Sequence, residues 1–237
     1  MIWWSEDTPY IEIFGLNHLI YVLILMASIT LLLIFRKSVV RNRKKFAIFL
    51  LTVSVLQQIL LYSWYTFETG FDMSDALPFH ICRIATLLGI IFLLTKNKHI
   101  LEIIFYFGLF AYGSFFYPSR IHPIYHVMGI SFLVNHTLTV LLPYFGYIAY
   151  GWRPKLKGLF RVYGYFLIYF AFVYFLNPLI DGNYFYLKYR PFFSSWPDYI
   201  YVPVVLIVVF IGFLFAFWIV SLIEKKGEKV KLESSAS

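Results

Sequence analysis

The stretch LPFHICRIATLLG, residues 77–89, places three chemically capable side chains within four positions, at the start of an apolar run. They are His80, Cys82 and Arg83. A histidine titrates near working pH and can act as a general base, and a thiol is the readiest side-chain nucleophile at neutral pH. A guanidinium can grip a phosphate or carboxylate through two hydrogen bonds. The sequence therefore predicts that His80 and Cys82 are catalytic and that Arg83 binds substrate.

The geometry of a regular helix limits how these three residues can cooperate. Pro78 suits a first helical turn, which would put all three side chains in the first turns of a helix over 77–95. His80 and Arg83 would then share a face, whereas Cys82 would lie about 200° around the helix from His80. Two alternatives stay open. In the first, Cys82 is a nucleophile whose general base comes from another helix. In the second, His80 and Arg83 form the functional face of the helix, and Cys82 is a small packing residue.

Histidines elsewhere in the chain could supply that base. His122, His126 and His136 fall at about 0°, 40° and −40° if they lie on one continuous helix, so three imidazoles would line one face. We predict His136 as a catalytic general base, and His122, His126 and His18 as substrate-binding residues. The alternative is that His122 and His126 lie in water at the membrane boundary and that His136 is a hydrogen-bonded interior residue.

Two further apolar runs carry aligned polar residues, which usually face the interior of a helix bundle. We predict that Asn177 and Asp181 bind substrate, and the Asn177 amide could donate to a developing oxyanion. The aligned residues of the other run are interpreted as hydrogen-bonding contacts between helices, worth about 1 kcal/mol each. The two sets are Tyr163, Tyr174, Asn177 and Asp181 in and just after 162–180, and Ser54, Gln57, Gln58, Tyr65 and Glu68 in and just after 46–67.

These residues must be positioned by membrane-spanning helices. The chain is 61% hydrophobic and 14% charged, whereas a soluble domain carries about 25% charged residues. Apolar runs of roughly 20 residues recur, and each can cross a hydrocarbon layer about 30 Å thick. The sequence predicts an all-α polytopic membrane protein, with a single domain over 1–223. Its seven predicted transmembrane helices are 11–35, 46–67, 77–95, 100–117, 124–150, 162–180 and 198–223.

Basic residues gather on one side of this predicted bundle. Sixteen of the 20 lysines and arginines lie in 36–45, 96–98, 152–161 and 224–231. The positive-inside rule places these segments in the cytoplasm, with the N-terminus outside and the C-terminus inside. Residues 224–237 are expected to form a disordered basic tail. The polar residues of the first, third, fifth and sixth spans then concentrate in the outer half of the bundle.

The residue pattern excludes several function classes. The net charge of +8 comes mostly from short loops between apolar runs, so nucleic acid is not an expected partner. One cysteine allows neither an intramolecular disulfide nor a cysteine metal cluster. Walker A, Rossmann and HExxH patterns are absent from the sequence, and 198–223 has no lysine for a retinal Schiff base. Zinc bound by His122, His126 and a third ligand and bis-histidine haem stay open as alternatives, but we predict no cofactor and no metal.

Four segments in order resemble one known family. They are GLNHLIYVL, LPFHICRIATLLGIIFLLTKNK, FLVNHTLTVLLPYFGYIAYGWRPK and LNPLIDGNYFYLKYRP. The chain resembles the YwaF family of bacterial seven-span membrane proteins, which is distantly similar to a eukaryotic transmembrane phospholipid acyltransferase. The resemblance implies a lipid-modifying role in the bacterial cytoplasmic membrane, and it makes Asn183 and Tyr184 substrate-binding candidates. The motif positions it implies are His18, His80, Cys82, His136, Asn177, Asn183 and Tyr184.

The leading functional prediction is a lipid-active membrane enzyme that performs acyl transfer or hydrolysis in a polar cavity of the outer half. Its partner would be a phospholipid or another acyl lipid. A second prediction is a transporter or binding protein for an anionic solute or lipid headgroup, using the same cavity. A third is a non-catalytic partner in an envelope assembly. The enzymatic prediction depends on imidazoles from separate helices meeting in one polar cavity.

Overall fold

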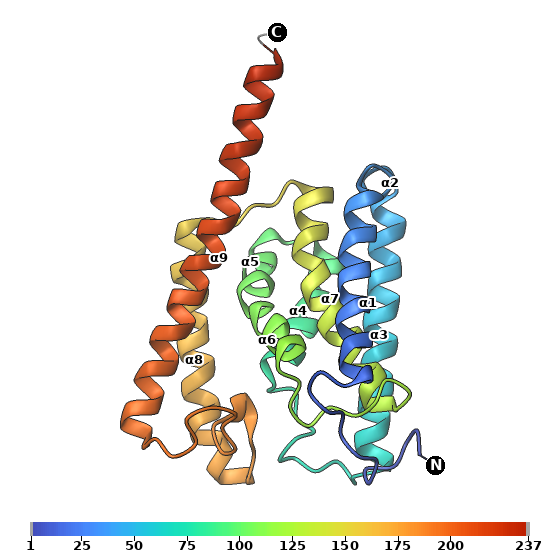
Figure 1. Ribbon diagram of the computed structural model, residues 1–237, viewed down its shortest axis with the longest axis vertical. Helices are drawn as coiled ribbons and strands as arrows, with labels where there is room; N and C mark the ends of the chain where they lie inside the picture. The colour runs from blue at the N-terminus through green and yellow to red at the C-terminus, as the bar shows by residue number, and fades with distance from the viewer. Residues whose placement is uncertain (1, 236–237) are drawn as a thin grey trace.

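The computed structural model describes the backbone of residues 2–235 and side chains up to Lys226. The described part is helical with irregular connections and contains no strand, which confirms the predicted all-α class (Figure 1). In chain order the helices are α1 (Leu16–Ile34), α2 (Arg36–Arg41), α3 (Arg43–Phe67), α4 (Ile81–Thr95), α5 (Lys98–Phe107), α6 (Leu109–Phe116), α7 (Val127–Tyr150), α8 (Leu156–Ile180), the 3₁₀ turn η1 (Tyr184–Tyr186) and α9 (Asp198–Ser235).

Six segments within the described residues are long and apolar enough to cross a membrane. They are α1, α3, α5 together with α6, α7, α8 and the part of α9 up to Lys226. Each corresponds to a predicted span, although Gly108 separates α5 from α6. The remaining predicted span, 77–95, forms only the 15-residue helix α4. Such a helix is about 22 Å long, shorter than a hydrocarbon layer of about 30 Å, so a seventh crossing stays a prediction.

The two ends of the bundle differ in chemistry. Figure 1 shows the N-terminus and the connections 68–80, 117–126 and 181–197 at one end, which we call the loop end. The turn around α2, the 151–155 connection and the C-terminal part of α9 lie at the opposite end, which we call the basic end. The predicted separation of basic loops from the aromatic connections is therefore present in the fold. Which end faces the cytoplasm stays a prediction.

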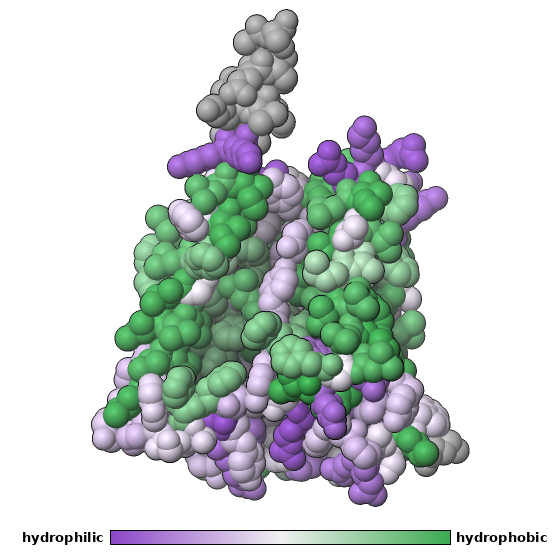
Figure 2. Space-filling view, viewed as in Figure 1, coloured by the Kyte–Doolittle hydropathy of each residue, from purple (hydrophilic) through white to green (hydrophobic). Residues whose placement is uncertain are grey.

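The outer surface has the pattern of a membrane protein. Figure 2 shows apolar residues covering the sides of the bundle and hydrophilic residues gathered at its two ends. Large exposed side chains on this belt include Leu23, Phe49, Ile168, Phe175 and Phe215. Such a belt would be costly in water, since contiguous apolar patches on soluble monomers rarely exceed a few hundred Å². The chain is accordingly a multi-pass membrane protein.

Helix α7 occupies the centre of the bundle and contacts α1, α2, α3, α4, α5 and α6. Close approach to α4 requires Gly89, because a Cβ there would lie 2.5 Å from Leu142 Cδ1. Gly146 of α7 likewise faces Leu101 of α5 with no room for a side chain. Small residues at helix contacts are the usual means of tight packing in membranes. The polar residues of α7 are therefore held inside the protein rather than toward lipid.

Helices α8 and α9 form a pair at one side of this centre (Figure 1). Aromatic rings join them to the remaining helices, for example Tyr106 of α5 and Phe213 of α9, whose ring centroids lie 4.9 Å apart. Helix α9 runs past the predicted boundary at 223 to Ser235. The predicted disorder of 224–237 stays a prediction, and residues 236–237 lie outside the described residues.

Candidate functional site

Four residues form a hydrogen-bonded cluster at the loop end, which we call the His80 cluster: Tyr65, Asp75, His80 and Arg83. Tyr65 lies near the end of α3, Asp75 in the 68–80 connection, His80 directly before α4 and Arg83 in its first turn. The Tyr65 hydroxyl donates to Oδ2 of Asp75 and accepts from Nη2 of Arg83. The Arg83 guanidinium also lies over the Tyr65 ring, 4.8 Å from its centroid. One network therefore joins a phenol, a carboxylate, an imidazole and a guanidinium.

Arg83 shapes the connection that carries Asp75. Its buried guanidinium donates from Nη1 to the backbone carbonyls of Asp75 and Leu77, the second at 3.1 Å. Its Nη2 lies 3.7 Å from Oδ2 of Asp75. Most of the donors of this side chain are thus engaged within the protein. The predicted use of Arg83 as a grip on substrate stays a prediction, and what the geometry supports is a positioning role.

These bonds also explain where α4 begins. The Leu77 amide donates to the Tyr184 hydroxyl at 3.1 Å, and the neighbouring carbonyls face Arg83. Because these backbone groups are satisfied without a helix, α4 begins three residues after Pro78. His80 is the residue before the helix and has an extended backbone, with φ −65° and ψ 131°. The prediction that His80 lies within the helix is therefore wrong, and so is the angle calculated from it.

His80 is held by Asp75 and presents its other nitrogen outward. Its Nε2 lies 2.6 Å from Oδ1 of Asp75. A carboxylate can only accept hydrogen bonds, so Nε2 carries the proton and Nδ1 carries the lone pair. Within the described residues Nδ1 makes no hydrogen bond, and the side chain is 25% exposed. The Tyr184 ring lies beside the imidazole, with centroids 4.8 Å apart.

The charges of the His80 cluster favour a carboxylate beside a neutral imidazole. Although desolvation of Asp75 would raise its pKa, the hydrogen bond and charge of His80 and the charge of Arg83 hold that pKa well below its usual range. Burial lowers the pKa of His80, the charge of Arg83 lowers it further, and Asp75 only partly offsets them. At neutral pH the imidazole therefore retains the lone pair that a general base needs.

Cys82 lies in the first turn of α4 and is buried. It is buried in the same apolar core as Tyr169 and Val173 of α8, and its thiol interacts with the Ser114 hydroxyl. Within the described residues no histidine hydrogen-bonds to this thiol. A nucleophilic cysteine normally has an adjacent base or a lowered pKa, and the polar neighbour here is a hydroxyl. Its predicted catalytic role stays a prediction that the geometry does not favour.

His136 is the second imidazole near the site. Its Nδ1 donates to the Phe132 carbonyl one turn earlier in α7, at 2.8 Å, and its ring lies against the Phe132 ring. It lies within electrostatic range of both His80 and Arg83. The Nε2 atom has no hydrogen bond in the described part of the chain and is not fully enclosed. Two of the predicted catalytic residues, His80 and His136, therefore come from separate segments into one neighbourhood.

His122 and His126 do not join that neighbourhood through a common helix. Helix α7 begins at Val127, so His122 lies in the preceding connection and His126 is the residue before the helix. The two rings stack at 4.1 Å between centroids, beside Trp64. The predicted line of three imidazoles on one helix is therefore wrong. The reason is that the Met128 amide takes the His126 side chain as its cap, at 3.1 Å, and this ends the helix there.

The stacked pair is buried rather than solvated at the boundary. His126 Nε2 donates to the Ser5 carbonyl at 3.1 Å, which ties the N-terminal segment to α7. Burial, and then the neighbouring charge of His126, lower the pKa of His122 to about 4. Both nitrogens of His126 are taken by backbone groups. This arrangement does not offer zinc two free imidazole nitrogens, and no group of three or more metal-binding side chains occurs within the described residues.

His18 has a structural position. Its Nδ1 accepts from the Phe14 amide at 2.9 Å, and its Nε2 donates to the Phe115 carbonyl at 2.7 Å. Both ring nitrogens are thereby used to join α1 to α6 and to shape the start of α1. Asn17 beside it accepts from the Ile124 amide at 3.2 Å. The predicted role of His18 in binding substrate stays a prediction, and it would require these bonds to break.

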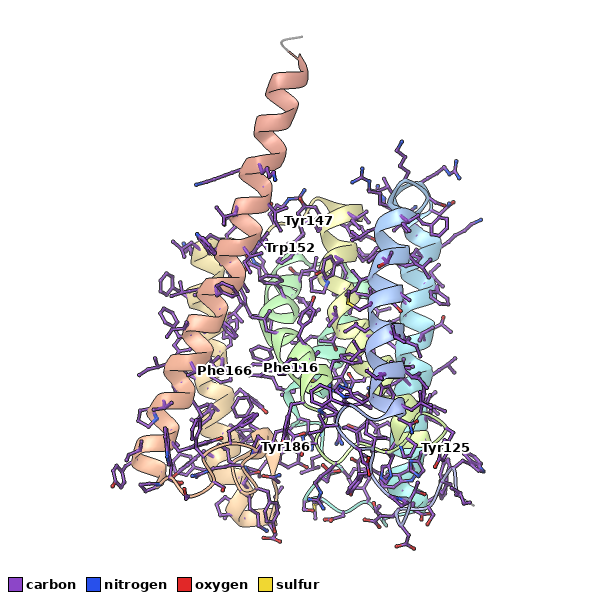
Figure 3. All side chains as sticks on the ribbon, viewed as in Figure 1. Phe116, Tyr125, Tyr147, Trp152, Phe166 and Tyr186 are labelled. Atoms are coloured by element: carbon purple, nitrogen blue, oxygen red, sulfur yellow. The ribbon has the colours of Figure 1, made fainter. Side chains whose placement is uncertain are left out.

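The connection after α8 supports the His80 cluster from the side. Asn177 makes two bonds of 2.9 Å to the backbone of Tyr184, one as donor and one as acceptor. The Tyr184 hydroxyl in turn donates to the Met73 carbonyl at 2.8 Å. Asn177 is therefore occupied in positioning Tyr184, and its predicted role as an oxyanion donor would require another conformation. Figure 3 shows Tyr186, which belongs to this connection, at the loop end.

Asn183 and Asp181 lie at the exposed margin of this connection. The Asn183 side-chain oxygen accepts from the amides of Lys188 and Tyr189, at 3.0 and 2.9 Å. Asp181 forms an exposed ion pair with Lys188, at 2.6 Å. Both residues therefore stabilise the fold of the 181–197 segment. Their predicted contacts with substrate stay predictions.

Asp75 and Tyr65 were not predicted as functional residues. Tyr65 is aligned with other polar residues in 46–67, and Asp75 is one of several acidic residues at this end. The only sequence feature that could have indicated the bond to His80 is weak. It is the presence of a carboxylate, Asp75, five residues before the histidine in an irregular segment. The predicted interhelical bonding of Gln57 is confirmed by its bond of 2.7 Å to Ser131 of α7. A further buried group, unpredicted, joins Thr86, Asn135 and Thr139.

Two surface hollows lie away from the His80 cluster. One, of about 270 Å³, lies at the loop end between the N-terminal segment and the 117–126 connection. The other, of about 370 Å³, lies around α2 at the opposite end of the bundle. Neither is lined by His80, Cys82 or His136. The predicted polar cavity shared by several imidazoles therefore stays a prediction.

The model of the TMEM164 family matches residues 13–221, which is most of the chain and includes every helix except the end of α9. Neither the curated proteins nor the solved structures contain a match to the chain. The matched range includes the entire His80 cluster.

Proposed function

The chain belongs to the TMEM164 family of transmembrane proteins, and we propose that it is a lipid-active membrane enzyme. It transfers an acyl chain from a phospholipid or another acyl lipid to a hydroxyl group or to water. The reaction takes place at the His80 cluster. The observation that supports this proposal is the Asp75–His80 pair, in which a carboxylate holds one imidazole nitrogen at 2.6 Å and leaves the other unpaired.

In this proposal His80 is a general base and then a general acid. Nδ1 takes the proton from the acceptor O–H as that oxygen attacks the carbonyl carbon of the acyl ester. The tetrahedral intermediate then breaks the bond between the acyl carbon and the lipid oxygen. His80 returns its proton to the departing lipid oxygen, which leaves as a lysolipid hydroxyl. With water as acceptor, the products are a free fatty acid and a lysolipid.

The first turn of α4 supports this assignment. The Ile81 and Cys82 amides directly follow His80 and make no hydrogen bond with any described group. Unpaired amides at a helix N-terminus carry partial positive charge and favour a developing negative oxygen. Donors of this kind typically contribute about 3 kcal/mol to acyl transfer. The backbone thus supplies a candidate oxyanion site beside the proposed base.

Direct transfer is favoured over a thioester on Cys82. The thiol is buried in the apolar core with Ser114 as its polar neighbour. His136 is the candidate for a second proton carrier, because its free Nε2 lies in the same neighbourhood as His80. We therefore assign His80 the central role and leave Cys82 as a packing residue.

The membrane orientation is part of the proposal. The basic end, with 36–45 and the end of α9, faces the cytoplasm under the positive-inside rule. The His80 cluster then opens toward the outer leaflet of a bacterial cytoplasmic membrane. A tag on the C-terminus should be unreachable to a membrane-impermeant label in intact cells and reachable after lysis. Labelling in intact cells would contradict the orientation.

The test of function is turnover by the purified protein. We expect fluorescent phospholipids in micelles to yield lysolipid with either fatty acid or acyl-exchanged lipid, resolved by mass spectrometry. Cys82→Ser should retain most of this turnover, and the wild-type protein should carry no hydroxylamine-sensitive acyl group. Loss of turnover in Cys82→Ser together with such an acyl group would replace direct transfer by a thioester mechanism. Absence of any product with phospholipid, glycerolipid or lysolipid donors would reject the enzymatic proposal.

A further inference from the structure

A hollow at the basic end combines aromatic rings with polar groups. Its volume is about 370 Å³, and it lies where α1, α2 and α3 meet. It is at the opposite end of the bundle from the His80 cluster, and the proposed acyl chemistry makes no use of it. Its lining residues are Phe35, Ser38, Val39, Asn42, Lys45, Phe46 and Phe49.

The polar side of this hollow is held by local hydrogen bonds. Asn42 lies between α2 and α3, with φ −108° and ψ 26°, and therefore breaks the helix. Its side-chain amide donates to the Ser38 carbonyl at 3.1 Å and approaches the Ser38 hydroxyl at 3.4 Å. On the apolar side, the Phe46 ring packs against Phe145 of α7, with centroids 5.3 Å apart. The hollow is therefore preformed by the fold.

The basic residues beside this hollow form no ion pairs with described residues, although Arg43 donates to the Ala149 carbonyl at 3.4 Å. Six basic residues lie in 36–45, and none of them forms an ion pair with a described residue. The two described carboxylates at this end are committed elsewhere, Glu102 to Arg161 and Glu224 to Arg153. Figure 2 shows strongly hydrophilic residues at this end directly beside the apolar belt. An anion that meets these cations must come from outside the chain.

The aromatic lining decides which kind of anion fits. Phe35 and Phe49 are 56% and 59% exposed and belong to the apolar surface that faces lipid. A soluble anion or an aqueous protein partner would leave these rings uncovered. A phospholipid places a phosphate at the level of Lys45 and an acyl chain against the rings. Basic pockets at the cytoplasmic side of membrane helices are known sites for anionic headgroups.

We propose that this hollow binds an anionic phospholipid from the leaflet at the basic end. The Lys45 ammonium and the Ser38 hydroxyl hold the phosphate, and Phe35 and Phe49 contact the acyl chain. The neighbouring cations of 36–45 raise the local concentration of anionic lipid. The site is separate from the His80 cluster, so its occupancy can be measured whether or not the protein turns over lipid.

The test is lipid retention by the full-length protein. Purified protein is equilibrated with micelles containing equal amounts of phosphatidylglycerol and phosphatidylcholine, and bound lipids are counted by native mass spectrometry. We expect wild type to retain phosphatidylglycerol preferentially. Lys45→Gln should lower this retention about fivefold, the effect of one lysine near a membrane surface. Lys157→Gln, an equal charge change on α8 at the same end, should leave retention unchanged.

Two further variants separate charge from shape. Lys45→Arg keeps the charge and should keep most of the preference for phosphatidylglycerol. Phe49→Ala removes part of the acyl contact and should lower retention of both lipids, with circular dichroism showing an intact helical fold. Equal retention of the two lipids by wild type, equal loss in Lys45→Gln and Lys157→Gln, or displacement of the lipid by millimolar inorganic phosphate would each overturn the proposal.

Discussion

Two clusters at opposite ends of the bundle contain the same three functional groups in opposite arrangements. In the His80 cluster a histidine, a carboxylate and an arginine are joined at the loop end, with Arg83 buried and the His80 Nδ1 open. At the basic end, Glu102 of α5 binds Arg161 of α8, and His99 lies 3.9 Å from the Glu102 carboxylate. There the carboxylate is enclosed and the His99 side chain is 73% exposed. We call this second group the Glu102 cluster.

The two clusters contain the same kinds of side chain, and which of them is buried determines what each cluster can do. In the Glu102 cluster the enclosed carboxylate needs its arginine, because an unpaired buried charge costs several kcal/mol. The His99 side chain there is exposed, and its Nδ1 accepts from Nη2 of Arg161 at 3.0 Å instead of bonding to the carboxylate. In the His80 cluster the enclosed member is the arginine, and the imidazole is held at one nitrogen and free at the other. We therefore interpret the His80 cluster as a site for proton transfer and the Glu102 cluster as a structural link between helices.

The largest expected effect is a difference in phospholipid turnover between variants of His80 and of His99. His80→Ala should lower phospholipid turnover by about 10²- to 10⁴-fold, the usual contribution of general acid–base catalysis. His99→Ala should change turnover less than twofold, because its side chain is exposed and lies at the other end. Both rates are measured with fluorescent phospholipid in matched micelles. Similar losses of turnover in the two variants would show that His80 has no catalytic role that His99 lacks.

The next effect concerns the stability of the Glu102 cluster. Arg161→Gln leaves the enclosed Glu102 carboxylate without its partner and should lower the free energy of unfolding by about 3 kcal/mol. Thermal unfolding in detergent, followed by circular dichroism, measures the change. Lys157→Gln on the same helix is the control, since Lys157 is exposed and has no ion pair among the described residues. Equal melting temperatures for the two variants would show that the Glu102–Arg161 ion pair does not stabilise the fold.

A smaller effect tests how Asp75 tunes His80. Asp75→Asn should lower turnover at least about tenfold, because the imidazole loses its orienting carboxylate. The Asp75 carboxylate raises the pKa of His80, so its removal should lower that pKa further. Turnover requires neutral His80 and falls as the pH drops through this pKa. The acid limb of the pH–rate profile should therefore move to lower pH, and a shift to higher pH would contradict the assignment.

The smallest effect probes the packing around Glu102. A Cβ on Gly158 would lie 2.5 Å from Oε1 and 2.6 Å from Cδ of Glu102. Gly158→Ala should therefore push the carboxylate from its position and destabilise the protein by about 1 kcal/mol. Gly164→Ala, two turns along α8, meets nothing within 4 Å and should be neutral or slightly stabilising. An equal rise in melting temperature in both variants would show that a Cβ at position 158 does not displace the Glu102 carboxylate.

The transmembrane segments were predictable because hydropathy depends on local composition. The predicted span 46–67 corresponds to α3 (Arg43–Phe67), and the predicted span 124–150 to α7 (Val127–Tyr150). The errors are concentrated at helix starts near the loop end. His80 and His126 were both predicted inside helices, and both instead precede a helix. Hydrogen bonds that Arg83 donates to backbone carbonyls, and that the Tyr184 hydroxyl and the His126 side chain accept from backbone amides, set those starts. Hydropathy contains no information about these bonds.

The partners of His80 were less predictable than His80 itself. Its residue type and its position beside Cys82 and Arg83 were sufficient to select it. The link to Asp75 depends on an irregular segment folded around the Arg83 guanidinium, and no helical period relates two residues in such a segment. The Glu102 cluster was missed because Glu102 and Arg161 are 59 residues apart.

The sequence alone determined that this chain crosses a membrane several times, that its basic loops share one end and that His80 is a candidate for chemistry. These properties follow from the composition of continuous segments and from the intrinsic acidity of single side chains. Only the tertiary structure decided which carboxylate lies against that imidazole, which groups Arg83 donates to, and which backbone groups bind the ring nitrogens of His18 and His126. Such assignments depend on distances of about 3 Å between distant segments, because hydrogen bonds form only at that range.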